Sequence, residues 1–274
     1  MNKHFPVAGA LAVVLGLSLA AIPLMVKAQG GGTAPRPMRT PDGRPNLNGI
    51  WQALNTAHWD LEDHSPAPGA LYQMGAVGAT PGGPGVVEGG TIPYKPEALA
   101  RKKINFASRL SLDPEVKCYM PGVPRATYMP FPFQIVQSTN MILMAYEFAS
   151  SDRVINMGKP VEAAVDTWMG TANGRWEGDT LVVDNTGFND KTWFDRAGNF
   201  HSDQLRVVER FTLIGPDHIQ YEATIEDPQT FTRPWKISMP LYRLVEKNVQ
   251  LTDFKCVEFA EELLYGHLRK EPSK

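Results

Sequence analysis

The chain has 274 residues, of which 43% are hydrophobic and 20% are charged, so it has enough apolar material to bury a core. Its 27 basic and 29 acidic residues give a formal net charge of −2, which argues against a polyanionic partner such as nucleic acid. The sequence has no phosphate-binding loop, dinucleotide fingerprint, Cys-x-x-Cys pair or His-Glu-x-x-His motif. We therefore expect neither a cofactor nor a metal site.

The N-terminal segment has the pattern of a secretory signal. Lys3 precedes an uncharged run over residues 5–26, and Val26 and Ala28 lie where a signal peptidase reads small side chains. The pattern predicts cleavage after Ala28, with an uncleaved anchor as the alternative. Cleavage removes two lysines and no acid, which leaves 246 residues with 25 basic against 29 acidic side chains and a net charge of −4. We expect a periplasmic or secreted protein with no membrane span after cleavage.

The mature chain predicts one domain over residues 46–274, preceded by a flexible linker over residues 29–45. A short strand is expected at residues 48–52. Residues 58–64 group two histidines with three acids, but their spacing does not place both histidines on one helix face. An acidic turn is therefore a better interpretation than a metal site. Residues 65–93 are rich in Gly and Pro and predict a long loop, which either lies on the surface or closes over a cavity.

A helix is predicted over residues 96–110, with Leu99, Phe106 and Leu110 on its inner side. The proline at its first turn supports this start, because proline is well suited to the first helical position. The turn-rich block that follows contains Arg125 among aromatic and proline residues. An arginine held in such surroundings can bind an anion, so we place Arg125 in the predicted ligand site.

The two cysteines, Cys118 and Cys256, belong to a chain with an export signal, and we expect them to form a disulfide. Two separately buried thiols are the alternative. The cross-link would attach a short terminal helix, predicted over residues 259–269, to the middle of the domain. Chain-entropy reasoning gives such a long closed loop a stabilising effect of about 4 kcal/mol.

Residues 133–244 predict an antiparallel β meander. Short β-branched and aromatic runs alternate with turn residues, and no helix long enough for a parallel crossover lies between them. Together with the opening strand they make eight or nine strands, enough to close into a barrel with an interior of ligand size, and a β-sandwich is the alternative. The expected strands cover residues 133–138, 141–148, 152–157, 167–177, 180–188, 205–213, 219–226 and 235–244.

Residues 189–203, between two of these strands, carry the densest group of reactive side chains. His201 titrates near neutral pH, and Asp195 and Asp190 offer carboxylates that can orient its ring. Because the flanking strands are long enough to cross a small barrel, we expect this loop at a rim, with His201 and Asp195 paired over the cavity and Trp193 at its entrance. A histidine that only caps backbone groups is the alternative.

Three further residues complete the predicted ligand site. Glu209 lies on a strand in which neighbouring side chains face opposite ways, and if it faces inward Arg153 or Arg233 can pair with it. Such a pair is either a structural ion pair or the floor of a polar site. Trp168 suits an aromatic or planar ligand, although packing in the core is its simpler role.

Two functions from different classes fit these residues. One is a cofactor-free acid–base enzyme, of hydrolase, lyase or isomerase type, which acts on a small organic molecule through His201 and the aspartates. The other is a non-catalytic carrier whose barrel holds a lipophilic or aromatic ligand. An enzyme would bring His201, a carboxylate and an arginine to one cavity, whereas a carrier would keep them outside an apolar cavity.

Several blocks of the sequence resemble a group of uncharacterised secreted bacterial proteins. The resemblance covers nearly the whole mature chain and implies secretion and one compact domain, but it implies no activity and no functional residue. The triplet Gly49-Ile50-Trp51 is also similar to the first-strand motif of lipocalin-like barrels, which agrees with the predicted fold. The blocks are WDLEDH, KCYMPGVPRATYMPFPFQIVQ, WMGTANGRWEGDTLVVDNTGFND, TWFDRAGNFHSDQLRVVER and IEDPQTFTRPWKISMPLYR.

Overall fold

The computed structural model describes residues 38–69 and 72–268. The predicted signal peptide and most of the predicted linker lie outside the described residues. The last part of the linker region forms a turn, in which Arg39 and Pro45 make a β-bridge. Arg39 also pairs with Asp179 of the barrel at 2.7 Å.

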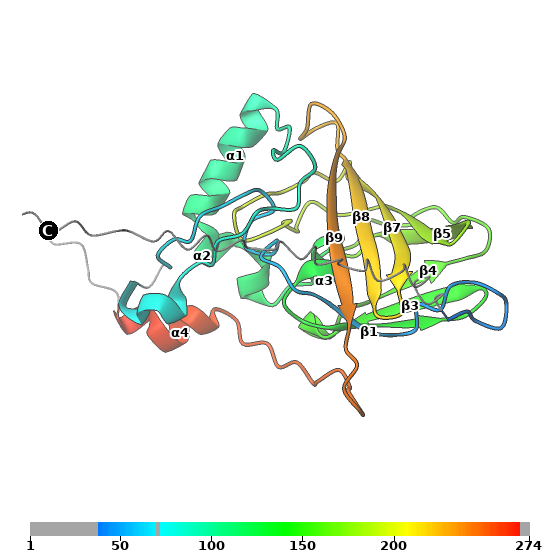
Figure 1. The fold of residues 1–274 in the computed structure, drawn as a ribbon. Coiled ribbons are helices and arrows are strands. Elements are labelled where there is room, and N and C mark those ends of the chain that lie inside the picture. Colours follow the sequence, from blue (N-terminus) through cyan, green and yellow to red (C-terminus); the bar gives the residue numbers. More distant parts are fainter. Residues whose placement is uncertain (1–37, 70–71, 269–274) are drawn as a thin grey trace, which may run out of the picture. The chain divides into compact units, whose positions relative to one another are not determined.

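A closed barrel of nine strands forms the centre of the domain, which confirms the predicted fold (Figure 1). Each strand pairs with the next one in the sequence, and β1 closes the ring by pairing with β9. The strands are β1 (Gly49–Ala53), β2 (Phe133–Gln137), β3 (Met141–Tyr146), β4 (Asp152–Asn156), β5 (Thr171–Glu177), β6 (Thr180–Thr186), β7 (Arg206–Gly215), β8 (His218–Glu226) and β9 (Trp235–Arg243).

One pair of neighbouring strands departs from the predicted antiparallel meander. β4 and β5 run parallel, with Ile155 opposite Ala172 and Asn156 opposite Asn173, whereas the other neighbouring pairs are antiparallel. Residues 157–170 carry the chain back along the barrel before β5 begins. The residue pattern within each strand does not encode this return path, so strand direction was wrongly predicted here.

Alternating side chains fill the interior of the barrel. β8 shows the period of two clearly, because Ile219, Tyr221, Ala223 and Ile225 are buried and the residues between them are only half-buried. Inward side chains from all nine strands, including Trp51 of β1, belong to one hydrophobic cluster. The interior is therefore a packed core, stabilised by about 25 cal/mol for each Å² of apolar surface removed from water.

Short helical segments lie outside the barrel strands (Figure 1). The predicted helix over residues 96–110 forms, but it breaks at Ser108. The described α-helices are α1 (Pro96–Ala107), α2 (Arg109–Leu112), α3 (Arg125–Tyr128) and α4 (Ala260–Tyr265), and the 3-10 turns are η1 (Tyr72–Gly78), η2 (Pro114–Lys117), η3 (Phe148–Ser150) and η4 (Gly266–Leu268).

The inner side of α1 differs from the prediction. Leu99 and Phe106 are 40% and 48% exposed, and the buried side chains are those of Ala98 and Asn105. The cause is Gly198, which has a positive φ and approaches the helix so closely that a Cβ atom there would lie 2.7 Å from the Phe106 nitrogen. Asn105 donates a hydrogen bond to the Gly198 carbonyl oxygen at 3.2 Å, so a short polar side chain takes the inner position.

The Gly- and Pro-rich residues 65–93 are held against the domain at several points. Isolated β-bridges join His64 to Gly83 and Val87 to Ile237 of β9. The predicted long loop is thus attached both to itself and to the barrel. Part of it borders the pocket described below.

The disulfide between Cys118 and Cys256 forms as predicted, with the two Cα atoms 5.8 Å apart. It attaches residues 251–265, which we call the C-terminal arm, to the region after η2. Within the arm, the Phe254 ring lies 4.9 Å from that of Phe131, and the Phe259 nitrogen donates to the Val116 carbonyl oxygen at 2.7 Å. The arm therefore packs beside segments that are far from it in the sequence.

Candidate functional site

His201 is buried in the loop between β6 and β7, with 1% of its surface exposed. Burial lowers its pKa, so the ring is neutral at neutral pH. In this state Nδ1 donates to the Ser202 carbonyl oxygen at 2.8 Å, and Nε2 accepts from the Thr192 hydroxyl at 2.6 Å. Both ring nitrogens are therefore engaged within the loop.

Asp195 is also fully buried, but it does not pair with His201. Its carboxylate accepts hydrogen bonds from the backbone nitrogens of Leu61, Ala197 and Asn199 and from the Asn199 side chain. In the described part of the chain no hydrogen bond joins Asp195 to His201, so the predicted direct contact is absent. The carboxylate holds the loop in shape and ties it to residue 61.

Asp195 gives a testable dependence of stability on pH. Burial raises its pKa from 3.8 to about 7, and Asp60 acts in the same direction, while hydrogen bonds from Asn199 and Leu61 oppose the rise. Between these two pH values the folded state keeps a proton on Asp195 that the unfolded state loses. Protonation of Asp195 therefore stabilises the folded state fully below a pH of about 4, and this contribution is lost as the pH rises to about 7. We expect the free energy of unfolding of the wild type to fall, relative to that of Asp195→Asn, by up to about 1.4 kcal/mol per pH unit over this range.

Urea unfolding at a series of pH values measures this difference. Asp190→Asn is the matched control, because Asp190 belongs to the same loop but is exposed. The control should show no comparable slope relative to the wild type. A wild-type minus Asp195→Asn difference that stays constant would mean that Asp195 is ionised throughout the range.

The other residues predicted in this loop do not gather around a cavity. Asp190 is exposed and acts on the pKa of His201 only through its charge. Trp193 is 8% exposed and packs in a small cluster with Ala98 and Phe200 beneath α1. The loop that sequence reasoning favoured is thus mainly a covering element of the core.

Arg153 and Glu209 form a buried ion pair inside the barrel. Of the two roles predicted for this pair, this is the structural ion pair and not the floor of a polar site. Arg153 donates to both Glu209 oxygens at 2.5 and 3.0 Å, and Asn185 and Tyr221 donate to the same carboxylate. Arg153 also borders, together with Trp168, a pocket of about 590 Å³ beside the parallel strand pair. Its two terminal nitrogens are nevertheless bound to Glu209, so they are not directed at a ligand there.

Arg125, the first residue of α3, is the centre of a buried charge network. It donates to Asp113 at 2.9 and 3.2 Å and to Glu115 at 2.6 Å. Arg196 binds Glu115 from a second direction, through Nε at 2.9 Å and Nη2 at 2.6 Å. Burial acts to raise the pKa of Glu115, but the guanidinium groups of Arg196 and Arg125 outweigh it and hold this pKa well below its usual range. The anion predicted for Arg125 is thus supplied by the protein's own carboxylates.

His58 lies beside this network as a neutral ring. Burial lowers its pKa to about 3, so it carries no charge at neutral pH. Its Nδ1 lies 3.8 Å from Glu115 Oε2, which is too far for a hydrogen bond, and it has no hydrogen-bond partner among the described residues. The contact between His58 and Glu115 is therefore not an ion pair at neutral pH.

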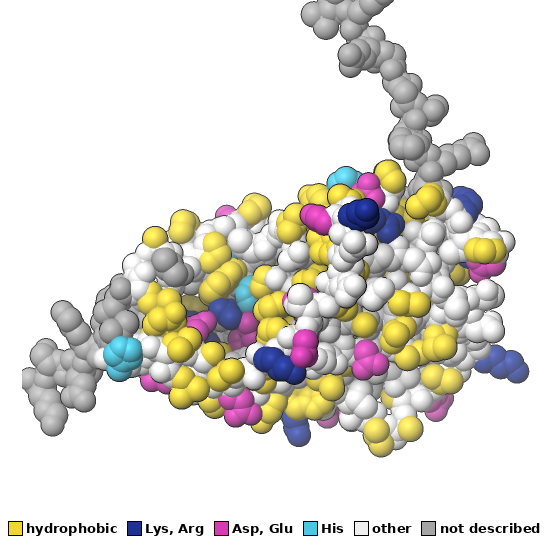
Figure 2. All heavy atoms as spheres, turned by 90° about the horizontal axis from the view of Figure 1, so that it is seen from below, with side chains coloured by type: hydrophobic (Ala, Val, Ile, Leu, Met, Phe, Trp, Pro, Cys, Tyr) yellow, Lys and Arg dark blue, Asp and Glu magenta, His cyan; other side chains and the backbone are white. Residues whose placement is uncertain are grey.

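Two adjoining cavities meet at Arg196, and we call them together the Arg196 pocket. The first has a volume of about 280 Å³ and lies between α2 and a segment that includes Gly69, Met74 and Thr80. The second, of about 310 Å³, lies between η2 and the C-terminal arm. Figure 2 shows a hollow in the surface where hydrophobic side chains surround acidic and basic ones. The residues that border both cavities are Leu110, Val116, Arg196 and Glu261.

Aromatic side chains form much of the wall of the Arg196 pocket. Trp59 and Phe106 border the first cavity, and the Arg196 guanidinium lies over the Trp59 ring, 4.5 Å from its centre. The second cavity has its own aromatic group, made of Phe131, Phe148, Phe254 and Phe259. Flat apolar walls with a few charged groups are typical of sites for small organic ligands.

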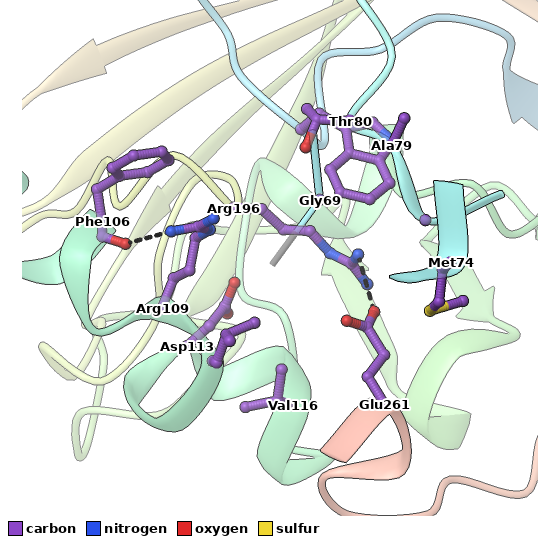
Figure 3. A pocket seen from close by; sticks show the side chains of 13 residues that line it. Gly69, Met74, Ala79, Thr80, Phe106, Arg109, Asp113, Val116, Arg196 and Glu261 are labelled. Atoms are coloured by element: carbon purple, nitrogen blue, oxygen red, sulfur yellow. Dashed lines mark hydrogen bonds and ion pairs between the residues drawn. The ribbon is translucent and has the colours of Figure 1, made fainter. Parts of the chain in front are cut away.

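Arg109 points into the first cavity from α2 (Figure 3). Its Nη1 donates to the Phe106 carbonyl oxygen at 2.9 Å, and its guanidinium group lies over the Phe106 ring, 4.3 Å from the ring centre. Among the described residues no salt bridge joins Arg109 to a carboxylate. Burial lowers the pKa of this half-buried group, and the charge of Glu261 opposes the effect. Arg109 is therefore a cation that the described protein does not neutralise by direct contact.

The sequence analysis did not single out the charged residues that line this pocket. Arg109 lies where the predicted helix breaks, Arg196 is next to a residue that was chosen, and Glu261 belongs to the predicted terminal helix. The one available signal was the predicted disulfide, because it places the terminal helix beside the segment after Cys118. Arg109, near the end of the helix predicted over residues 96–110, lies close in sequence to Cys118 and could have been found from this signal.

Comparison with known proteins finds no matching family model and no matching curated sequence. The resemblance to secreted bacterial proteins remains a prediction. Among the residues that the structure describes, no group of three or more His, Cys, Asp or Glu side chains is placed to hold a metal ion. In the same residues no helix is long and apolar enough to cross a membrane.

Proposed function

We propose that this protein binds small amphipathic organic anions in the Arg196 pocket. The observation that carries the proposal is Arg109, a half-buried cation without a carboxylate partner in the described chain, on the wall of an aromatic cavity. A charged group removed from water is costly unless an opposite charge meets it, so this position favours an anionic ligand.

The dimensions and walls of the pocket support the same ligand class. Cavities of about 280 and 310 Å³ that share a boundary suit a molecule of small organic size. Trp59 and Phe106 add apolar ring surface for its hydrocarbon or aromatic part, on the sides that Arg196 and Arg109 do not cover. An anion near Arg109 and an apolar body against these rings would satisfy both features at once.

Binding without catalysis agrees better with the geometry than acid–base chemistry does. Glu115 is ionised and both of its oxygens accept from arginines, so it is a poor proton acceptor. His201 and Asp195 do not border the Arg196 pocket. The ring nitrogens of His201 are bound within the loop, and the Asp195 carboxylate is bound by Asn199, Ala197 and Leu61. The carrier alternative is therefore the better supported one, with the ligand beside the barrel and not inside its packed core.

The experiment compares an anionic probe with a neutral one of similar shape. Anilinonaphthalene sulfonate and N-phenylnaphthylamine both fluoresce in apolar pockets, and only the first carries a charge. We expect Arg109→Gln to weaken binding of the sulfonate about tenfold, the effect of losing one charge-assisted contact, and to leave the neutral probe unchanged.

The matched control is Lys103→Gln, which removes an exposed cation from neighbouring α1. Its sulfonate affinity should equal that of the wild type. An equal loss in both variants would mean that the probe senses only net charge. Unchanged sulfonate binding in Arg109→Gln would remove the main support for the proposal.

A further inference from the structure

Glu261 of the C-terminal arm holds the position at which an anion would reach Arg196. The Nε and Nη2 atoms of Arg196 are both bound to Glu115, which leaves Nη1 as its remaining terminal nitrogen. Within the described part of the chain, the one hydrogen-bond partner of Nη1 is the Glu261 carboxylate, at 3.4 Å (Figure 3). At 3.4 Å this contact is long, and the Glu261 side chain is 54% exposed to water. It is therefore weaker than the buried ion pairs that Glu115 makes with Arg196 and Arg125.

The same contact lies at the boundary of the two cavities. Arg196 and Glu261 border both of them, so their side chains stand where one cavity passes into the other. The Glu261 carboxylate points toward Arg196 (Figure 3), and its charge also opposes the fall of the Arg109 pKa. A ligand anion that bound Arg196 Nη1 would therefore compete with Glu261.

We infer that Glu261 is a built-in competitor that closes the junction of the Arg196 pocket, and that an anionic ligand opens the junction by replacing Glu261 on Arg196 Nη1. This inference rests on the proposed function. It narrows the ligand class to amphipathic anions whose charged group lies at the junction and whose apolar parts extend into the cavities. Because the Cys118–Cys256 disulfide tethers the arm close by, the competing carboxylate is present at a high local concentration.

The test is Glu261→Gln, which keeps the size of the side chain and removes its charge. We expect the affinity for anilinonaphthalene sulfonate to rise about two- to fivefold, the range expected for the loss of one weak ion pair. The affinity for neutral N-phenylnaphthylamine should not change. Glu258→Gln is the matched control, because Glu258 lies in the same arm and is exposed, and it should leave both affinities as they are.

Two outcomes would overturn the inference. An unchanged or lower sulfonate affinity in Glu261→Gln would show that Glu261 does not compete, and an equal rise for both probes would show that the change only loosens the arm. Tryptic digestion of the variant checks that the arm stays attached. The proposed function fails separately, when Arg109→Gln binds the sulfonate as the wild type does.

Discussion

Replacing Glu209 with leucine should lower the free energy of unfolding by about 3 to 5 kcal/mol, the usual cost of leaving one member of a buried ion pair without its partner. Arg153 has 2% of its side chain exposed and Glu209 none, so water cannot replace the lost carboxylate without opening the barrel. Tyr221 would also lose its acceptor at 2.8 Å. Urea unfolding followed by circular dichroism measures the effect.

A second substitution separates the charge effect from the loss of packing. In the double variant Arg153→Met, Glu209→Leu no uncompensated charge remains, so most of the lost stability should return. Glu226→Gln is the control, because it breaks an exposed ion pair with Arg206 near the end of the same sheet and should cost less than about 1 kcal/mol. A loss as small as this in Glu209→Leu would mean that Arg153 finds another partner.

Removing the disulfide should have an effect of similar size. The bond joins residues 138 positions apart, and chain entropy gives its loss a cost of about 4 to 5 kcal/mol when Cys118 and Cys256 are both replaced by serine. Equilibrium unfolding of the double variant, and of the wild type in dithiothreitol, should give the same shift. Agreement between them would show that the missing cross-link, and not the serines, causes the loss.

The C-terminal arm provides an independent measurement of the same change. Without the disulfide the arm is held by ring contacts of Phe254 and by the Phe259 nitrogen, so limited proteolysis should cut within residues 251–265 much sooner. Rapid cleavage there together with an unchanged unfolding midpoint would contradict the chain-entropy expectation. It would show that the arm detaches while the barrel remains folded.

The barrel was predictable because its signal is local. In a strand such as β8 the alternation of Ile219, Tyr221, Ala223 and Ile225 with polar residues appears in the sequence itself, and it fixes which side chains face inward. The disulfide could be predicted from a count of two cysteines in a chain with a predicted export signal. Both predictions depend on the sequence alone and do not require the three-dimensional path of the chain.

The Arg196 pocket was not predictable in this way, because segments that are distant in sequence build it. Arg109, Arg196 and Glu261 become neighbours only after the disulfide and the loop before β7 have positioned them. Sequence reasoning chose His201 because its side chain is chemically reactive, but reactivity does not reveal burial. In the folded protein its two nitrogens are bound to Thr192 and Ser202.

The odd number of strands in the closed barrel explains why a parallel contact, such as that between β4 and β5, must occur. In a closed ring, strands can alternate in direction all the way round only when their number is even, because the last strand must also be opposite in direction to the first. This barrel has nine strands and closes antiparallel between β1 and β9, so an odd number of its other contacts must be parallel. The return path through residues 157–170 meets this requirement at one place. A variant that lost this path could keep the ring closed only by making another contact parallel or by gaining or losing a strand.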